Sequence, residues 1–367
     1  MFVSSTVLSG SYEPDDVVFL LKQVKVQTIC VAEKERLIQS GAAHYSEMIS
    51  DERRPDQRYL DIFEMAFARN TKRIGQDIAN IAATITHDIA RGELPSEITL
   101  CSLVRAGVPY GVLIHRELKA LGVNTLHYGI SIIRDRGLDT NAMNHILSTR
   151  NPSGVLFVDG WTGKGAISRE LEKSWADLGQ PFKPHLVVLA DPAGFASLSG
   201  SHDDWLIPSG ILGANVSGLI SRSILNDEVV GPNDYHGTML VTHLTDIDVS
   251  RRFVDEVAKS VEHFRPTASI LSHDPQVLKR LQETSANCAS IIAERHDVDN
   301  LNRVKPGIAE ATRAVLRRRP NRVFVRNGGD PDVAALVHLC KADGIPLIEA
   351  PDITGPYRAV TLIEKVS

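Results

Sequence analysis

Short and almost continuously apolar runs alternate with longer amphipathic segments in the middle of the chain. Such a run, bounded by glycine or polar residues, is typical of a strand that is buried on both faces. Strands of this kind that are separated by helical segments build a mostly parallel sheet. The pattern therefore predicts an α/β domain. Its expected strands are residues 98–104, 124–133, 154–159 and 185–190, and its expected helices are residues 110–120 and a segment that begins near Ala166.

The segments on either side follow other patterns. Residues 13–100 are expected to be mostly helical, because apolar residues recur at helical spacing from Ile74 to Ile89. Residues 239–244 are expected to form a strand, and residues 249–264 the helix after it. The C-terminal part shows a second α/β pattern. It has expected helices at 308–318 and 333–343 and expected strands at 322–326, 346–350 and 359–365.

Composition fits an ordinary globular protein, with 43% hydrophobic and 23% charged residues over 367 positions. The N-terminus lacks the basic and apolar segments of a secretory signal, and no apolar run is long enough to span a membrane, so a cytoplasmic location is expected. The four cysteines, with no CxxC pair, favour neither a zinc site nor a disulfide framework. Each is expected to be a small buried residue rather than a catalytic thiol. They are Cys30, Cys101, Cys288 and Cys340.

Positive charge gathers near the C-terminus, although the net charge of the chain is -5. Residues 303–326 hold eight Lys and Arg residues against one acid, Glu310. A local basic stretch on an acidic protein indicates a polyanionic partner for that segment. A solvated helix face explains the same pattern, and charge alone does not decide between the two.

Residues 155–168, VLFVDGWTGKGAIS, lead from an apolar strand through a glycine-rich loop into a helix. The loop lacks both the Walker pattern, because Gly165 follows Lys164, and the GxGxxG of dinucleotide-binding folds. It resembles the phosphoribosyl diphosphate (PRPP) loop of type I phosphoribosyltransferases, with Gly160 in place of the second acid. That resemblance implies that Asp159 holds a ribose and that the loop surrounds a phosphate at a helix N-terminus. The loop residues are Gly160, Thr162, Gly163, Lys164, Gly165 and Ala166.

A second stretch, SLVRAGVPYG at residues 102–111, resembles the pyrophosphate loop of the same family. The resemblance implies that Arg105 faces the diphosphate and that Gly107 lets the backbone approach it; a surface salt bridge is the alternative for Arg105. The mobile loop of the family would be residues 133–146, where Arg134 and Arg136 are candidates to contact the leaving pyrophosphate. An ordinary exposed loop would explain that cluster equally well.

Residues 5–265 together resemble the phosphoribosyltransferase domain of the StiP family from tellurium-resistance-type gene clusters, some members of which are called cysteine proteases. The stretches that carry the resemblance are SGAAHYSEMIS, LVRAGVPYG, VDGWTGKGAI, LADPAGFA and PSGILGANVSGLISR. It implies transfer of 5-phosphoribosyl from PRPP to an unidentified acceptor, with Mg²⁺ on the diphosphate and with Asp159, Arg105, Arg134 and Arg136 as catalytic residues. No Cys/His arrangement supports proteolysis, and Cys101 lies inside an apolar strand.

Residues 285–367 resemble the Pelota and kink-turn-binding RNA family, and residues 266–284 would be a connector. Lys305, Gly307, Glu310 and Arg313 match positions that contact RNA in that family, whereas Ala309 stands where it has Asn. The resemblance implies that this domain binds RNA. Reuse of the fold for dimerisation or docking is the alternative.

Two other functions and the acceptor pocket stay open. One alternative is a PRPP-sensing, RNA-binding regulator without catalysis, and the other is the reverse reaction on a phosphoribosyl nucleoside. The chain is expected to form a homodimer. The candidate acceptor residues are His44, Tyr45, Glu47, Asp191, Asn215, Ser217, Ser221 and Arg222.

Overall fold

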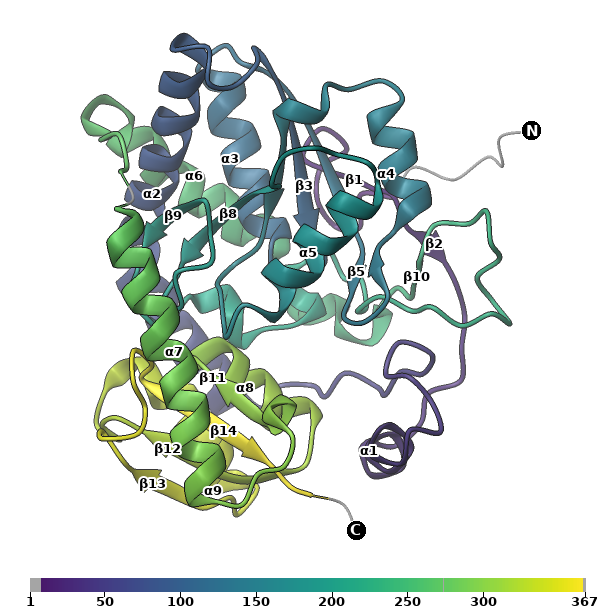
Figure 1. The fold of residues 1–367 in the computed structure, drawn as a ribbon, viewed down its shortest axis with the longest axis vertical. Coiled ribbons are helices and arrows are strands. Elements are labelled where there is room, and N and C mark those ends of the chain that lie inside the picture. The colour runs from purple at the N-terminus through teal and green to yellow at the C-terminus, as the bar shows by residue number, and fades with distance from the viewer. Residues whose placement is uncertain (1–7, 273, 366–367) are drawn as a thin grey trace.

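A six-stranded, wholly parallel sheet forms the centre of the larger domain in the computed structural model, which describes residues 8–272 and 274–365 (Figure 1). This arrangement confirms the α/β fold with a parallel sheet that the apolar runs predict. Its strands, in spatial order, are β1 (Val18–Phe19), β4 (Asn124–Ile130), β3 (Glu97–Leu103), β7 (Val155–Val158), β8 (His185–Ala190) and β9 (Leu198–Ser201).

Both faces of the sheet are covered, because successive apolar side chains of β3 and β7 enter two hydrophobic clusters on opposite faces. Leu100 and Leu156 pack into one hydrophobic cluster, while Cys101 and Phe157 pack into another on the opposite face. The first cluster includes residues of α2 (Gln57–Ala90), α3 (Val108–Ala120) and α6 (Ser250–Phe264). The second includes residues of α4 (Thr140–Leu147) and α5 (Ala166–Asp177).

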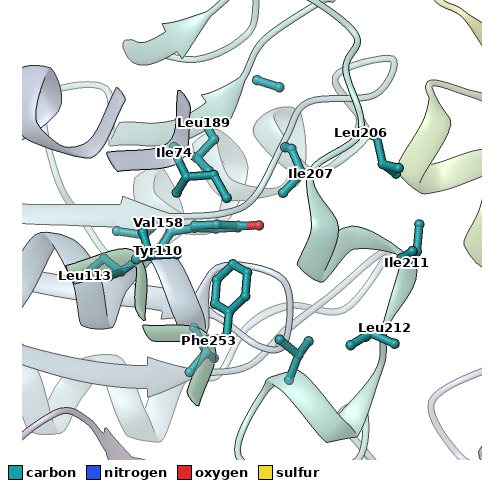
Figure 2. Packing of buried hydrophobic residues seen from close by; sticks show 14 of the residues in the cluster. Ile74, Tyr110, Leu113, Val158, Leu189, Leu206, Ile207, Ile211, Leu212 and Phe253 are labelled. Carbon is teal, nitrogen blue, oxygen red and sulfur yellow. The ribbon is translucent and has the colours of Figure 1, made fainter. Parts of the chain in front are cut away.

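Figure 2 shows the centre of the first cluster, where the ring of Tyr110 lies among side chains from helices and strands that are distant in sequence. Its hydroxyl hydrogen bonds to Ser209, so a polar group inside this core has a partner. Ser209 belongs to the short 3-10 helix η2 (Pro208–Ile211), which packs against α8 (Ile308–Arg317) of the C-terminal domain.

Two segments differ from the expected elements. Residues 239–244 do not form a strand; the pairing there ends with β10 (Gly237–Thr238), which lies parallel to β2 (Lys22–Gln23), and η4 (Thr242–Ile247) follows. Val241 and Leu244 instead fill a small cluster beneath a turn-rich segment. The expected helical region holds α2 and the short α1 (Val31–Ser40), but it also contains β1 and β2.

The C-terminal domain is a four-stranded mixed sheet with helices, seen at the bottom of Figure 1. This second α/β domain agrees with the pattern expected there. Its first helix, α7 (Pro275–Arg295), begins within residues 266–284, which the sequence assigned to a connector. The strands in spatial order are β11 (Val304–Pro306), β14 (Ala359–Ile363), β12 (Pro320–Val325) and β13 (Leu347–Glu349), and the helices are α7 (Pro275–Arg295), α8 (Ile308–Arg317) and α9 (Ala334–Ala342).

A buried carboxylate joins the two domains. Asp204 of the larger domain accepts hydrogen bonds from the backbone N–H of Ile308, at 3.0 Å, and of Arg358, at 2.7 Å. The residue before α8, Gly307, has a φ of 90° and no side chain with which to cap the helix. Asp204 therefore takes the place of a local N-cap. Apolar residues of α8 and η2 belong to one continuous cluster around this contact.

None of the helices within the described residues is both long enough and apolar enough to cross a membrane.

We expect Asp204→Ala to lower the free energy of unfolding by about 1–3 kcal/mol, because it leaves buried N–H donors without an acceptor. The measurement is chemical denaturation followed by circular dichroism. Asp203→Ala is the matched control, because the adjacent Asp203 forms only a surface ion pair with Arg73 and should lose less than about 1 kcal/mol. Equal losses in the two variants would contradict the role of Asp204.

Candidate anion-binding site between the domains

A cavity of about 340 Å³ lies between the carboxyl ends of the central strands and helix α8. The glycine-rich loop after β7 forms one wall, and β11 with α8 forms the opposite wall. We call this cavity the interdomain cleft. It brings together the phosphate-loop residues and the RNA-binding residues that the sequence predicts as two separate sites.

Positive charge dominates the interdomain cleft, because nine cationic side chains line it against two carboxylates. The carboxylates are those of Asp159 and Glu310. An excess of this size in a partly closed cavity attracts anions. The cations are Lys34, Arg105, Arg134, Lys164, Arg222, Lys305, Arg313, Arg317 and Arg318.

The loop from Asp159 to Gly165 turns sharply into α5. Gly165 has a φ of 77°, and a Cβ there would lie 2.6 Å from the ring of Phe195, so the turn requires glycine. Residues 163–167 line the cleft at the start of α5. The amino end of a helix favours an anion through its N–H groups and its dipole.

Other loop residues are engaged within the protein. The Thr162 hydroxyl donates to Asp191, and the Lys164 ammonium donates to the carbonyl oxygens of Leu301 and Val304. Burial and the nearby Lys305 lower the pKa of Lys164 to about 7. The C-terminal domain therefore holds the loop closed through Lys164.

Asp159 follows β7 and lines the cleft, as expected for a residue that contacts a ligand. One of its oxygens accepts the N–H of Gly160 at 2.8 Å. Burial raises the pKa of Asp159 to about 6, although the Gly160 N–H and the positive charge of Arg313 oppose that rise. Gly160 does not line the cleft; its carbonyl oxygen accepts from Leu189 and Ala190 of β8.

Arg105 reaches the cleft with its charge already paired. Its guanidinium donates to Glu52 at 2.5 Å and to the Ile220 carbonyl oxygen at 3.1 Å. Burial opposes the charged form of Glu52, yet Arg105 holds the pKa of that carboxyl at about 2. Arg105 is thus a buried ion-pair partner rather than the surface salt bridge that the sequence left open.

Gly107 packs the helix against the sheet. A Cβ at this position would lie 1.9 Å from the Val158 carbonyl oxygen, so only glycine lets α3 start so close to β7. Gly107 does not line the interdomain cleft, in contrast to the expected approach of its backbone to a diphosphate.

The expected mobile loop, residues 133–146, is folded. It contains β6 (Gly137–Leu138), which pairs with β5 (Ile132–Ile133), and most of α4, whose N-terminus Asp139 caps at 3.0 Å. A polar N-cap and the buried side chains of α4 give this segment a packed structure, which its polar composition did not predict. Arg134 lines the cleft and its Nε is buried without a partner among the described residues, whereas Arg136 pairs with Glu47 outside the cleft.

The residues expected to bind RNA face the larger domain. Lys305 lies 3.6 Å from Glu310, and both line the cleft. Arg313 stacks over the ring of Trp161 at 4.6 Å, and its Nε is buried without a partner in the described part of the chain. Gly307 lies buried beside Asp204, so an RNA duplex does not fit against this face while the domains are docked.

The packing of Ala309 accounts for the absence of the Asn that the kink-turn-binding family has at this position. Its side chain is 6% exposed, and its Cβ lies 3.1 Å from where a Cβ on Gly210 would be. A larger polar side chain would collide with η2 at this contact. The position that would carry an RNA-contacting Asn therefore serves the docking of the two domains.

Four cationic side chains of the cleft were not among the expected phosphate-binding or RNA-binding residues. They come from α1, from the end of α8 and from the segment after η3 (Ala214–Val216). The basic stretch at 303–326 indicated Arg317 and Arg318, whereas no local sequence pattern indicated Lys34 on α1. They are Lys34, Arg222, Arg317 and Arg318. A second cavity of about 120 Å³ adjoins the cleft and shares Lys34, Arg105, Arg222 and Arg317 with it.

The cysteines differ in their exposure. Cys101, Cys288 and Cys340 are buried as expected, and burial raises the pKa of each thiol. Cys30 is exposed, which corrects its expected burial, and it occupies the position before α1. Within the described residues no imidazole hydrogen bonds to Cys30.

The comparisons with known proteins identify the family. The model of the family described as "Tellurite-like stress resistance cysteine protease StiP" matches residues 10–258. A relative named "Cysteine protease StiP", from Acinetobacter baylyi (strain ATCC 33305 / BD413 / ADP1), is 43% identical over 370 residues, which cover 98% of this chain and 94% of the relative. The chain belongs to the StiP family. In addition, the model of the PELOTA RNA binding domain matches residues 283–365 and confirms the resemblance seen at the C-terminus.

Membership of the StiP family overturns the expected activity. The family and the curated relative are named as cysteine proteases, so the expectation of PRPP-dependent phosphoribosyl transfer is wrong, together with its two alternatives and the exclusion of a protease. A phosphate-binding loop does not specify the reaction of the protein that carries it. A loop of that kind specifies only a type of ligand.

Solved structures resemble a part of the chain. A hypoxanthine phosphoribosyltransferase of Trypanosoma cruzi shares 18% identity, with 36% of this chain and 77% of that chain covered, at a TM-score of 0.29. The same enzyme in complex with the product IMP shares 17% identity over 35% of this chain and 75% of that chain, also at 0.29. Nothing about the activity of this StiP-family chain follows from likenesses this distant.

The burial of the Asp159 carboxylate should make the free energy of unfolding depend on pH. Its folded pKa, about 6, lies above the ordinary value of 3.8, so the charged carboxylate destabilises the fold above pH 6 and this cost disappears as the pH falls towards 4. We expect Asp159→Asn to raise the free energy of unfolding by about 2 kcal/mol at pH 8 and to leave it unchanged at pH 4. Urea denaturation at both pH values measures the difference.

The control for this prediction is Asp227→Asn, because Asp227 is exposed and its replacement should change the free energy of unfolding by less than about 0.5 kcal/mol at either pH. A loss of stability in Asp159→Asn at pH 8 would show that the carboxylate stabilises the fold.

Proposed function

We propose that the interdomain cleft of this StiP-family chain binds a small phosphorylated ligand. One observation carries the proposal: nine cationic side chains face two carboxylates, and two of the cations, Arg134 and Arg313, keep a buried Nε without a partner in the described residues. A buried donor without an acceptor is costly to a fold. An anion with several oxygens would supply acceptors to both walls at once.

Mutual repulsion among the cations supports the same ligand class. Burial, together with Arg105 and Arg313, lowers the pKa of Arg317 to about 9. Burial lowers the pKa of Lys305 to about 8, although Glu310 opposes the change. Because these groups hold their charge less readily than free side chains, a multiply charged anion would restore it and gain affinity in return.

The size of the cleft favours a nucleotide-sized ligand over an RNA duplex. A volume of about 340 Å³ suits a small molecule. The C-terminal domain belongs to a family of RNA-binding domains, but its matching residues are covered by the larger domain. RNA would therefore reach the cleft only as a terminal nucleotide or phosphate.

PRPP with Mg²⁺ is one ligand of this chemistry. Among the described residues no group of three His, Cys, Asp or Glu side chains could hold a metal ion. Mg²⁺ would then arrive on the phosphates of the ligand, and Asp159 is the carboxylate that the loop presents to the cleft. Homodimer formation remains a prediction from the sequence.

Calorimetric titration with tripolyphosphate tests the proposal. We expect the wild-type chain to bind, and Arg313→Met with Arg317→Met to weaken binding at least ~10-fold, because each guanidinium forms a charge-assisted contact. Affinity should also fall as salt rises, though less than for a surface site. Lys279→Met is the control, because Lys279 is exposed and its side chain lies 4.0 Å from Glu283 on α7. Equal affinity in all variants, or no binding, would remove the cleft as an anion site.

We further propose that any peptidase activity of this chain depends on Cys30. The name of the family supports a thiol nucleophile, and Cys30 alone among the four cysteines is exposed. It lies at the N-cap position of α1, where its exposed thiol is accessible for attack on a peptide carbonyl carbon.

Cys30→Ser should abolish hydrolysis of an unfolded substrate such as casein and should remove alkylation of the folded chain by iodoacetamide at the exposed thiol. Cys340→Ser is the control, since Cys340 is buried and its replacement should leave both readouts unchanged. Thiol-dependent hydrolysis that persists in Cys30→Ser would show that the nucleophile lies elsewhere.

A further inference from the structure

Lys34 lies where the interdomain cleft and the adjoining cavity meet, because its side chain lines both. It sits on α1, a helix distant in sequence from both walls of the cleft, and it is 6% exposed. A buried lysine almost always has a partner. The ammonium of Lys34 has no hydrogen bond and no ion pair with any residue that the structure describes.

The other two lysines of the cleft are engaged. Lys164 donates to the carbonyl oxygens of Leu301 and Val304, and Lys305 pairs with Glu310. Their amines hold the C-terminal domain against the loop and so contribute to structure. Lys34 has no such contact within the described residues, although its exposure of 6% is close to the 5% of Lys305.

The surroundings of Lys34 disfavour its positive charge. Burial is the largest cause that lowers the pKa of Lys34, and the positive charges of Arg222, Arg317 and Arg318 lower it further, to about 7. The carboxylate beside it, Glu35, is already held by Arg318 at 2.5 Å and does not restore the charge. The charges that act on Lys34 are those of Arg222, Arg317, Arg318 and Glu35. The adjoining cavity is lined as well by the Arg105–Glu52 pair and by Asp51, Arg53 and Asp56.

We propose that Lys34 is a nucleophilic amine that forms an imine with a phosphorylated aldehyde bound in the interdomain cleft. The neutral amine adds to the carbonyl carbon to give a carbinolamine, which loses water and leaves a C=N bond to Nζ. No oxidant or reductant takes part. The aldehyde's phosphate would lie against the arginines, so this inference rests on the proposed binding of a phosphorylated ligand.

Trapping with pyridoxal 5′-phosphate and borohydride tests the inference, because reduction fixes an imine as a stable secondary amine. At pH 7 we expect one dominant adduct, on Lys34, formed at least ~10-fold faster than on exposed lysines, whose amines are almost fully protonated. The rate should level off above pH 7 for Lys34 and keep rising for exposed lysines. Mass spectrometry of the digested protein locates the adduct.

Two variants make the test decisive. Lys34→Arg keeps a positive charge and cannot form an imine, so it should lose the dominant adduct. Lys279→Arg should behave as wild type. Pyridoxal without the phosphate should react at least ~10-fold more slowly at Lys34, because each phosphate contact contributes to binding.

The inference would be overturned by adducts that spread evenly over exposed lysines, by a dominant adduct that persists elsewhere in Lys34→Arg, or by equal rates with pyridoxal and its phosphate. Failure of the proposed function, which is anion binding in the cleft, gives a different result from failure of the imine. It would appear as absence of tripolyphosphate binding, whereas normal tripolyphosphate binding with no adduct on Lys34 would overturn the imine alone.

Discussion

The carboxylate of Asp204 links the larger domain to the C-terminal domain, and the interdomain cleft depends on that link. It accepts the N–H of Ile308 at the start of α8 and the N–H of Arg358 next to β14. Because Gly307 offers no cap of its own, the first turn of α8 is complete only when the domains are docked. The same contact turns Arg313 and Arg317 towards the glycine-rich loop.

Docking brings like charges together, and the fold tolerates them because some are paired. Arg105 is held by Glu52, Arg318 by Glu35 and Lys305 by Glu310. The remaining cations have no carboxylate of their own within the described residues, and their repulsion opposes docking. A bound anion would offset that repulsion and favour the docked arrangement, so ligand binding and domain closure are linked. Burial and, after it, the same repulsion lower the pKa of Lys34 to about 7.

Sequence patterns predicted the local structure around the cleft well. The strand before Asp159, the helix that begins at Ala166 and the helix of residues 308–318 all lie within a residue or two of their expected bounds. Those elements are set by apolar runs and by glycine, which are local signals. Misplaced elements, such as the expected strand at 239–244, lie where short apolar stretches fill clusters under irregular backbone.

The arrangement of the site could not be predicted in the same way. Two segments far apart in sequence face each other only because Asp204 and the apolar surface of α8 dock the domains, and no local pattern encodes that contact. The functions expected for Arg105 and Gly107 failed for a related reason: an internal ion pair and close helix–sheet packing engage them. Lys34 was missed because a lone lysine on a short helix carries no signal until its surroundings are known.

Hydrogen–deuterium exchange with and without pyrophosphate tests the central claim most directly, because it reports on both walls of the cleft in one experiment. The account predicts that amides of residues 163–167 and of residues 304–318 exchange more slowly together when pyrophosphate is bound. Protection of only one of these segments, or of neither, would contradict a single anion site built jointly by the two domains.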